Sequence, residues 1–392
     1  MRTIAAAIGT PTLLVFALVA GSDFASAQLM ISGNETKVDL SSGLPRGVAT
    51  NEPDSLSFID FSATPPSVWN MMDVSNSVVG PPSNIAISPD GRLALVASSV
   101  KYDASNESLW SPDTLIHVID LTSDEPKIVG QVHSDAQPSG ISFTRDGKLA
   151  LVANRAAGTV TPLSIDGQRV TALASVKVCE PADLASDVAV SRDGRRAYVS
   201  INERNHLREL IIDGTKLTPT ERKISVYGKP YRVVVTSDGE LCLTAGSGVG
   251  GAPDNDAVSI IDLTVEPVRA IQHVTIGQGP ESCELSPDGN LLAVVLMNGS
   301  NLPPGNPLLT KQGRLDLLER QGKTYVPVQQ LPIGPIPEGV AFTADGKKLV
   351  VQSHPERKLW VFAIENNRAR DTGERIDVPG MASSLRAVIP AP

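Results

Sequence analysis

The stretch NIAISPDGRLALVASS, residues 84–99, places Ser-Pro-Asp-Gly between two apolar runs. An Asp-Gly pair in this setting is typical of the tight turn of a β-hairpin, because Asp bonds nearby backbone amides and Gly adopts a positive φ. Near-copies of the stretch recur along the chain, and the six aspartates of their turns are Asp90, Asp146, Asp193, Asp238, Asp288 and Asp345. The spacings between successive aspartates are 56, 47, 45, 50 and 57 residues, which indicates an internal repeat.

Each repeat carries more than a hairpin. A third and a fourth apolar run follow the turn, for example 114–122 with 126–132 and 257–264 with 268–276. Four short strands in a period of this length are typical of one blade of a β-propeller. Near the N-terminus, residues 47–74 match the second, third and fourth strands of a blade, and residues 381–390 match a first strand alone.

These patterns predict an all-β fold, a seven-bladed β-propeller of four-stranded antiparallel blades. The C-terminal first strand is expected to join the N-terminal blade, which closes the ring and removes open sheet edges. The predicted organisation is a signal peptide at 1–27, an N-terminal extension at 28–44 and a single propeller domain at 45–392.

The first residues have the pattern of a secretory signal. Arg2 precedes a short apolar run at 12–20, and the small residues at 25–27 predict cleavage near Ala27. No later run is long and apolar enough for a membrane span, so we expect a periplasmic or secreted monomer without a transmembrane segment. The net charge of −9 argues against a nucleic-acid partner, which requires a basic face.

The three cysteines, Cys179, Cys242 and Cys283, permit at most one disulfide. The sequence contains no CxxC or CxxCH motif, which excludes zinc-knuckle spacing and covalent haem attachment. We expect these cysteines to be buried and to pack as small apolar side chains.

The segments SPDGRLALVAS (88–98) and SRDGRRAYVSIN (191–202), together with VIDL at 118–121, resemble the YVTN-type repeats of seven-bladed propellers. That superfamily includes lactonase-like proteins and the quinoprotein amine dehydrogenase β-chain-like group, and the resemblance covers about residues 45–390. It implies a ligand site at one mouth of the central channel. Two sets of loops would build this mouth, those that enter each first strand and those that join the second and third strands.

The resemblance also implies that the Asp-Gly turns lie on the opposite face. Six repeated aspartates are then turn residues rather than catalytic groups, and one Asp per turn does not supply the oxygen ligands of a calcium loop. Cytosolic lactonases of the superfamily carry Arg-His just after the proline of the loop that enters a first strand. This chain lacks that pair, which disfavours a phosphogluconolactonase activity.

The loops that enter the first strands differ around the ring. One side is small and neutral, whereas Tyr231, Arg232, Glu281 and Glu338 lie at the corresponding positions of three successive blades. Because closure of the fold needs only small residues there, the large polar groups favour a polar ligand. The alternative is that the two glutamates are solvated rim charges paired with Arg232.

The loops between second and third strands add Asn202 and His354 to the candidate set. The predicted ligand-binding residues are Ser83, Asp187, Asn202, Tyr231 and Arg232, and the predicted catalytic residues are Glu281, Glu338 and His354. The two glutamates are also the candidate ligands of a divalent cation, Ca²⁺ or Mg²⁺, since both cations prefer oxygen ligands.

Two classes of function fit these residues. The pattern favours an exported propeller that binds a periplasmic or extracellular protein, or a small polar ligand, at the loop-rich mouth. Long loops at 98–113, 245–256 and 296–313 support this hypothesis, with Tyr102 and Trp110 as candidate anchors for a partner.

The alternative is a lactonase-like hydrolase or a metal-assisted lyase at the same mouth. Arg232 would bind an anionic substrate and His354 would be the general base. A third hypothesis is an accessory role beside a periplasmic quinone or haem dehydrogenase.

Overall fold

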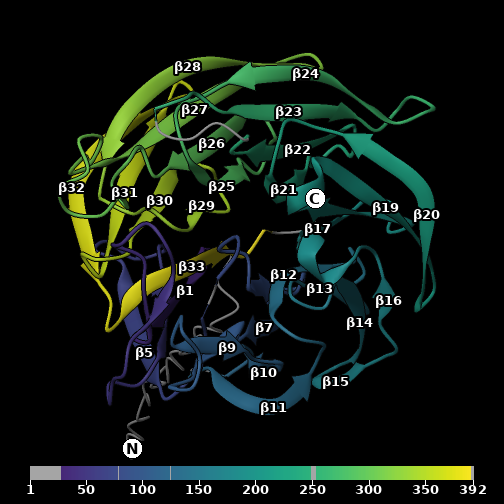
Figure 1. The fold of residues 1–392 in the computed structure, drawn as a ribbon, viewed down its shortest axis with the longest axis horizontal. Coiled ribbons are helices and arrows are strands. Elements are labelled where there is room, and N and C mark those ends of the chain that lie inside the picture. Colours follow the sequence, from purple (N-terminus) through teal and green to yellow (C-terminus); the bar gives the residue numbers. More distant parts are fainter. Residues whose placement is uncertain (1–27, 78, 124, 249–252, 390–392) are drawn as a thin grey trace, which may run out of the picture.

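Seven antiparallel sheets follow one another around a ring, as Figure 1 shows. This arrangement is seen in a computed structural model that describes residues 28–77, 79–123, 125–248 and 253–389. The predicted signal peptide, 1–27, lies outside these residues. The prediction of a seven-bladed β-propeller with four-stranded blades is confirmed.

Blades 1 to 3 follow in chain order. Blade 1 contains β6 (Ile85–Ile87), β7 (Leu93–Ala97), β10 (Leu115–Asp120) and β11 (Lys127–His133). Blade 2 contains β12 (Pro138–Phe143), β13 (Leu149–Asn154), β14 (Thr159–Asp166) and β15 (Arg169–Ala172), and the short β16 (Val176–Lys177) also pairs with β14. Blade 3 contains β17 (Ala185–Val190), β18 (Arg196–Ile201), β19 (His206–Asp213) and β20 (Lys216–Ser225).

Blades 4 to 6 repeat the same order. Blade 4 contains β21 (Pro230–Val235), β22 (Leu241–Gly246), β23 (Ala257–Asp262) and β24 (Arg269–Thr275). Blade 5 contains β25 (Pro280–Leu285), β26 (Leu291–Leu296), β27 (Gly313–Gln321) and β28 (Thr324–Ile333). Blade 6 contains β29 (Val340–Phe342), β30 (Lys348–Ser353), β31 (Lys358–Glu365) and β32 (Arg368–Asp377).

Blade 7 closes the ring with strands from both ends of the chain. It contains β33 (Met381–Ala387), β1 (Leu29–Glu35), β4 (Ser55–Asp60) and β5 (Ser67–Met72) in that order. The closing pair β33–β1 is antiparallel, and its register runs from Met30 opposite Ala387 to Glu35 opposite Met381. The C-terminal strand therefore joins the N-terminal blade, as predicted.

The second strand of blade 7 lies earlier in the chain than the repeat pattern indicates. This strand, β1, falls in the segment 28–44 that the sequence assigned to an extension, and residues 47–50 form no blade strand. The connection from β1 to β4 is long and carries the small hairpin of β2 (Val38–Asp39) and β3 (Arg46–Gly47). It has no Asp-Gly turn, so nothing in the repeat marks the position of β1.

The apolar core is divided among the seven junctions between blades. Each hydrophobic cluster draws its side chains from two neighbouring blades, including the junction of blade 7 with blade 1. Met30 and Ile31 in β1 are fully buried and belong to the clusters on the two sides of blade 7. Because burial of one large apolar side chain stabilises a fold by about 1.5–3 kcal/mol, loss of β1 would open two junctions at once.

The repeated Asp-Gly turns have the structural role that the sequence predicted. In the first copy, Asp90 Oδ1 accepts hydrogen bonds from the Ser88 hydroxyl at 2.6 Å and the Arg92 amide at 3.1 Å. The other five turns repeat this pair of bonds, always with a Ser or Thr two residues before the Asp. The glycines of these turns have φ values between +67° and +77°. The aspartates are therefore fixed within their own turns.

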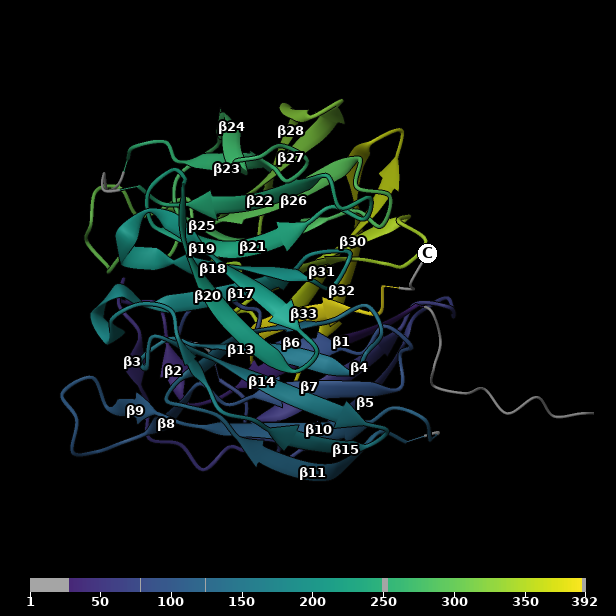
Figure 2. The same cartoon turned by 90° about the vertical axis from the view of Figure 1, so that its right-hand side faces the viewer.

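Two faces of the ring result. In Figure 2 the β2–β3 hairpin and the hairpin of β8 (Val100–Tyr102) with β9 (Trp110–Pro112) lie on the side away from the C-terminus. This is the face of the links between blades and of the loops between second and third strands. The described residues include only two short 3₁₀ turns, η1 (Pro181–Asp183) and η2 (Asn202–Arg204), and among these residues no helix is long and apolar enough to cross a membrane.

Replacing Gly194 by Ala should destabilise the fold by about 1–2 kcal/mol, because an L-residue is strained at positive φ. No atom lies within 4 Å of the added Cβ, so the loss of stability would come from backbone strain alone and not from a steric clash. Urea unfolding measures the change. The control is Gly130→Ala in β11, where φ is ordinary and the nearest atoms are 3.8 Å away. Equal unfolding midpoints for the two variants would contradict the assigned role of the turn glycine.

Candidate functional site

Charged side chains from four inner strands meet inside the channel. Arg232 in β21 donates to Asp187 Oδ2 of β17 at 3.2 Å and to Glu284 Oε2 of β25 at 2.8 Å. Arg386 in β33 donates to the same Glu284 oxygen at 2.6 Å. Burial and the neighbouring Arg232 lower the pKa of Arg386 to about 10. We call these four residues the channel network.

The channel network contains two of the predicted ligand-binding residues and contacts a third. The Asp187 carboxylate accepts further bonds from the Ser83 hydroxyl at 3.0 Å and from the Val233 amide at 2.9 Å. Arg232 is 5% exposed, and Ser83 and Asp187 are fully buried. Ser83 and Asp187 therefore have partners within the protein. Arg232 is paired too, but together with Glu284 and Arg386 it also lines a cavity of about 250 Å³ between the inner strands.

A second polar group lies at the loop-bearing mouth. The Tyr231 hydroxyl interacts with the Glu281 carboxyl, and the Arg155 guanidinium lies 5.5 Å from the centre of the Tyr231 ring. Glu281 also interacts electrostatically with Glu338 of the next blade. The structure thus brings together three residues predicted from the sequence, together with one that was not. We call Arg155, Tyr231, Glu281 and Glu338 the mouth cluster.

Burial controls the protonation of the mouth cluster. It raises the pKa of Glu281 to about 8, although Arg155 and Tyr231 oppose the shift. Burial, the Glu281 carboxyl and Glu35 together raise the pKa of Glu338 well above its usual range. Burial therefore favours the protonated form of both carboxyls, in which a carboxyl can donate as well as accept a hydrogen bond.

The sequence did not single out Arg155 or Glu35. Arg155 follows β13 in the short loop 154–158, and it donates to the Ser186 hydroxyl and to Asn202 Oδ1, the latter at 3.3 Å. The predicted residue Asn202 therefore positions Arg155. Glu35 is the last residue of β1 and accepts a hydrogen bond from the Ser77 hydroxyl. It lies outside the repeats, so no repeated motif marks it in the sequence. A basic residue in an otherwise small loop was the only available signal for Arg155.

His354 is not part of the mouth cluster. Its Nδ1 donates to the Ala382 carbonyl oxygen at 3.1 Å, and its charged neighbours are Asp39 and Arg357. The side chain is 1% exposed, and burial lowers its pKa to about 4. The geometry gives His354 a role in packing blade 6 against blade 7, and the proposed role as general base has no support in these contacts.

The predicted divalent cation stays a prediction. Among the described residues, no three or more His, Cys, Asp or Glu side chains form a group that could hold a metal ion. Glu281 and Glu338 remain a pair of neighbouring carboxyls, and they would bind a cation only after losing their protons. The three cysteines are free, with Cys242 and Cys283 buried as expected.

The two candidate anchors of the 98–113 loop differ. Trp110 in β9 donates from Nε1 to the Pro45 carbonyl oxygen at 3.2 Å, so it attaches the β8–β9 hairpin to the β2–β3 hairpin. Tyr102 in β8 is 40% exposed. Tyr102 is therefore the more exposed of the two rings, since Trp110 is half-buried.

Comparison with known proteins agrees with this architecture. A functionally unknown protein of Desulfotomaculum acetoxidans superposes with a TM-score of 0.67 at 14% identity, over 93% of this chain and 99% of the other. The periplasmic gluconolactonase of Pseudomonas aeruginosa superposes with a TM-score of 0.66 at 16% identity, over 92% of this chain and 99% of the other. The chain has the fold of lactonase-like seven-bladed propellers.

A Bacteroides fragilis protein provisionally assigned as a 6-phosphogluconolactonase superposes with a TM-score of 0.67 at 16% identity, over 91% of this chain and 97% of the other. No protein-family model matches the chain. No curated protein matches it either. At these identities the likeness establishes the fold alone.

The buried His354 predicts a pH dependence of stability. Its pKa is about 4 in the folded chain, against about 6.5 when unfolded, so the unfolded chain takes up the proton first as pH falls. The contribution of the neutral His354 side chain to the free energy of unfolding is complete above pH 6.5 and is lost as pH falls toward 4. Between pH 7.5 and 5.0 the loss should be about 2 kcal/mol.

The measurement compares urea midpoints at these two pH values for wild type and for His354→Asn. The variant should lose this part of the pH dependence, because it cannot be protonated. His133→Asn is the control, since His133 is exposed at the end of β11. A His354→Asn variant with the pH dependence of the wild type would show that this histidine does not govern it.

Proposed function

We propose that the protein binds a small polyhydroxylated ligand at the loop-bearing mouth, in contact with the mouth cluster. It would do so outside the cytoplasm, after removal of residues 1–27. The observation that carries the proposal is an unsatisfied buried group in this cluster. Glu338 Oε1 is buried and has no hydrogen-bond partner within the described part of the chain. A buried polar atom without a partner is costly, and a ligand hydroxyl would supply that partner.

A second unsatisfied atom lies beside Arg155. The Ser139 hydroxyl is buried and also lacks a partner among the described residues. Both Ser139 Oγ and the Arg155 side chain lie against Gly80, where an added Cβ would be 2.8 Å from Ser139 Oγ and 3.2 Å from Arg155 Cδ. Gly80 therefore lets Ser139 and Arg155 pack closely against the backbone, which places the unpaired hydroxyl beside the one cation of the mouth cluster.

The charge of the cluster indicates the ligand class. With both glutamates protonated, Arg155 carries the only formal charge of the mouth cluster. Neutral carboxyls and a phenol suit hydroxyl groups, and the guanidinium suits a carboxylate or a polarised carbonyl oxygen. Sugar acids and their lactones combine these features.

Hydrolysis of a sugar lactone is the second candidate, favoured by the likeness to the P. aeruginosa periplasmic gluconolactonase. Water would attack the lactone carbonyl while ionised Glu281 accepts its proton, and Arg155 would stabilise the developing oxyanion. The ring C–O bond then breaks, and the protonated ring oxygen leaves as the hydroxyl of the open acid.

Binding is tested by calorimetric titration with D-gluconate. Arg155→Met should weaken binding about tenfold or more, because it removes charge-assisted hydrogen bonds worth about 1.5–3 kcal/mol. Glu338→Met should weaken it too, since the vacant acceptor is lost. Arg92→Met, in a turn on the opposite face, is the matched control. If wild type fails to bind, or the control weakens binding equally, the mouth is not the site.

Catalysis is tested by following the opening of D-glucono-1,5-lactone above its spontaneous rate. The enzymatic rate should rise with pH up to about 8, the pKa of Glu281. Glu281→Gln should abolish this rate, because the amide cannot accept the proton. Addition of EDTA shows whether a divalent cation takes part. A wild-type rate equal to the spontaneous one removes the hydrolase hypothesis but leaves gluconate binding as a separate result.

A further inference from the structure

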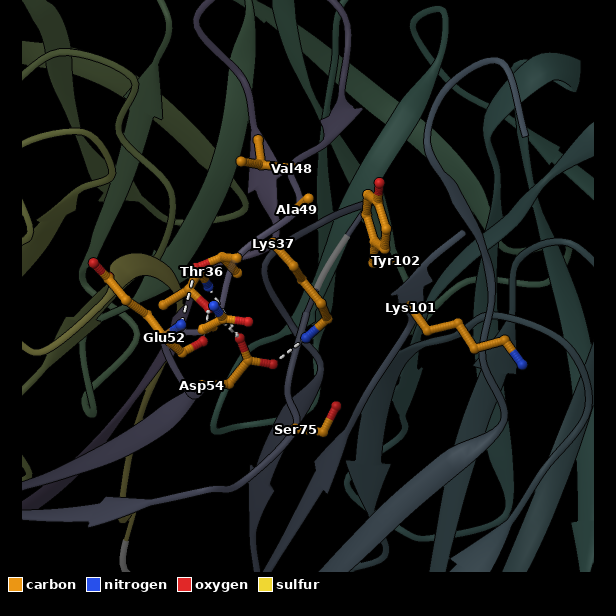
Figure 3. A pocket seen from close by; sticks show the side chains of 11 residues that line it. Thr36, Lys37, Val48, Ala49, Glu52, Asp54, Ser75, Lys101 and Tyr102 are labelled. Atoms are coloured by element: carbon orange, nitrogen blue, oxygen red, sulfur yellow. Dashed lines mark hydrogen bonds and ion pairs between the residues drawn. The ribbon is translucent and has the colours of Figure 1, made fainter. Parts of the chain in front are cut away.

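A hollow of about 470 Å³ lies on the loop-bearing face, and none of its lining residues belongs to the mouth cluster. Its walls come from the chain around the β2–β3 hairpin and from β8. Figure 3 shows Tyr102 on one wall and Thr36 and Glu52 on the other, with Lys37 and Asp54 between them. We call this hollow the hairpin pocket. Its volume lies in the range of about 300–1,000 Å³ that is usual for small-molecule sites.

Three of the four charged side chains that line the hairpin pocket are paired, and Lys101 is the fourth. Lys37 forms an ion pair with Asp54 and also donates to the Asn76 carbonyl oxygen at 3.1 Å. Glu52 pairs with Arg357 at 3.0 Å. In Figure 3 the ammonium of Lys101 points away from Asp54. The pocket therefore offers no unpaired charge inward, which favours a neutral ligand.

The remaining groups combine an aromatic face with hydrogen-bonding side chains. Tyr102 is 40% exposed, in a chain with only 4% aromatic residues. Thr36, Thr50, Asn51 and Ser75 line the same hollow. Their three hydroxyls each have at least one partner in the fold already, the Glu52 backbone for the two threonines and the Ser98 hydroxyl for Ser75. A hydroxyl can take part in more than one hydrogen bond. An exposed ring presents an apolar surface, on which the C–H groups of a sugar ring can pack. The hydroxyls of the sugar then meet the polar wall.

The position of Tyr102 is held by the fold. It pairs with Trp110 across the β8–β9 hairpin, and Trp110 is tied to Pro45. The Gly47 amide donates to the Ser108 carbonyl oxygen at 2.8 Å, and a Cβ on Gly47 would lie 1.9 Å from the Leu109 carbonyl oxygen. The two hairpins are therefore packed closely, which presents the aromatic wall without much loss of conformational entropy on binding.

We propose that the hairpin pocket binds one sugar ring of a neutral oligosaccharide, stacked on Tyr102. This site is separate from the mouth cluster and does not depend on ligand binding there. A partner protein is the other possible occupant of an exposed tyrosine, but a concave pocket lined by hydroxyls, an amide and internally paired charges matches a sugar better than an apolar side chain.

Calorimetric titration of the full mature chain with cellotetraose, maltotetraose and tetra-N-acetylchitotetraose tests the proposal. At least one of them should bind. Tyr102→Ala should weaken that binding about tenfold or more, whereas Tyr102→Phe keeps the ring and should stay within about threefold of wild type.

Two controls separate this site from others. Leu308→Ala removes an apolar side chain of similar exposure, 39%, from another long loop and should leave binding unchanged. Arg155→Met at the mouth should also leave it unchanged. The proposal is overturned if none of the three oligosaccharides binds, if Tyr102→Ala binds as wild type does, or if Tyr102→Phe loses as much affinity as Tyr102→Ala. It is likewise overturned if a protein, and no oligosaccharide, binds through Tyr102.

Discussion

The channel network is the interaction on which the arrangement of the inner strands depends. Seven inner strands converge on one axis, and charged side chains there persist only if they are paired. Arg232 joins β21 to β17 and β25, and Glu284 joins both arginines across the channel. Removal of one partner from a buried pair costs about 3–5 kcal/mol, so these residues hold four blades at fixed distances.

Two buried carboxyl groups near the axis differ in how completely they are hydrogen-bonded. Asp187 accepts bonds from a hydroxyl, a guanidinium and a backbone amide, so its carboxylate is satisfied within the protein. Glu338, nearer the loops, keeps one buried oxygen without a partner in the described chain. Burial alone does not distinguish a structural carboxyl from a functional one. A buried carboxyl oxygen without a partner marks a candidate for ligand binding, and Glu338 Oε1 shares this property with Glu35 Oε1.

The sequence predicted the fold well because the repeat has a local physical cause. Each hydroxyl-x-Asp-Gly turn fixes one hairpin through bonds that span only a few residues, so its signal survives in the sequence. The strand β1 has no such turn, and its place in blade 7 is set by pairing with β33, more than 340 residues away. A contact of that range leaves no local pattern, which is why the segment was assigned to an extension.

The candidate site was only partly predictable for a related reason. Departures from the repeat identified Tyr231, Glu281 and Glu338 correctly as neighbours, because corresponding positions of successive blades meet at the axis. The same argument placed Arg232 with them, although its side chain pairs with Asp187 and Glu284 inside the channel. Position along the chain fixes the blade, whereas the direction of a long side chain depends on which charges it meets. Arg155 shows the converse, since a short loop without any motif supplies the one cation of the mouth cluster.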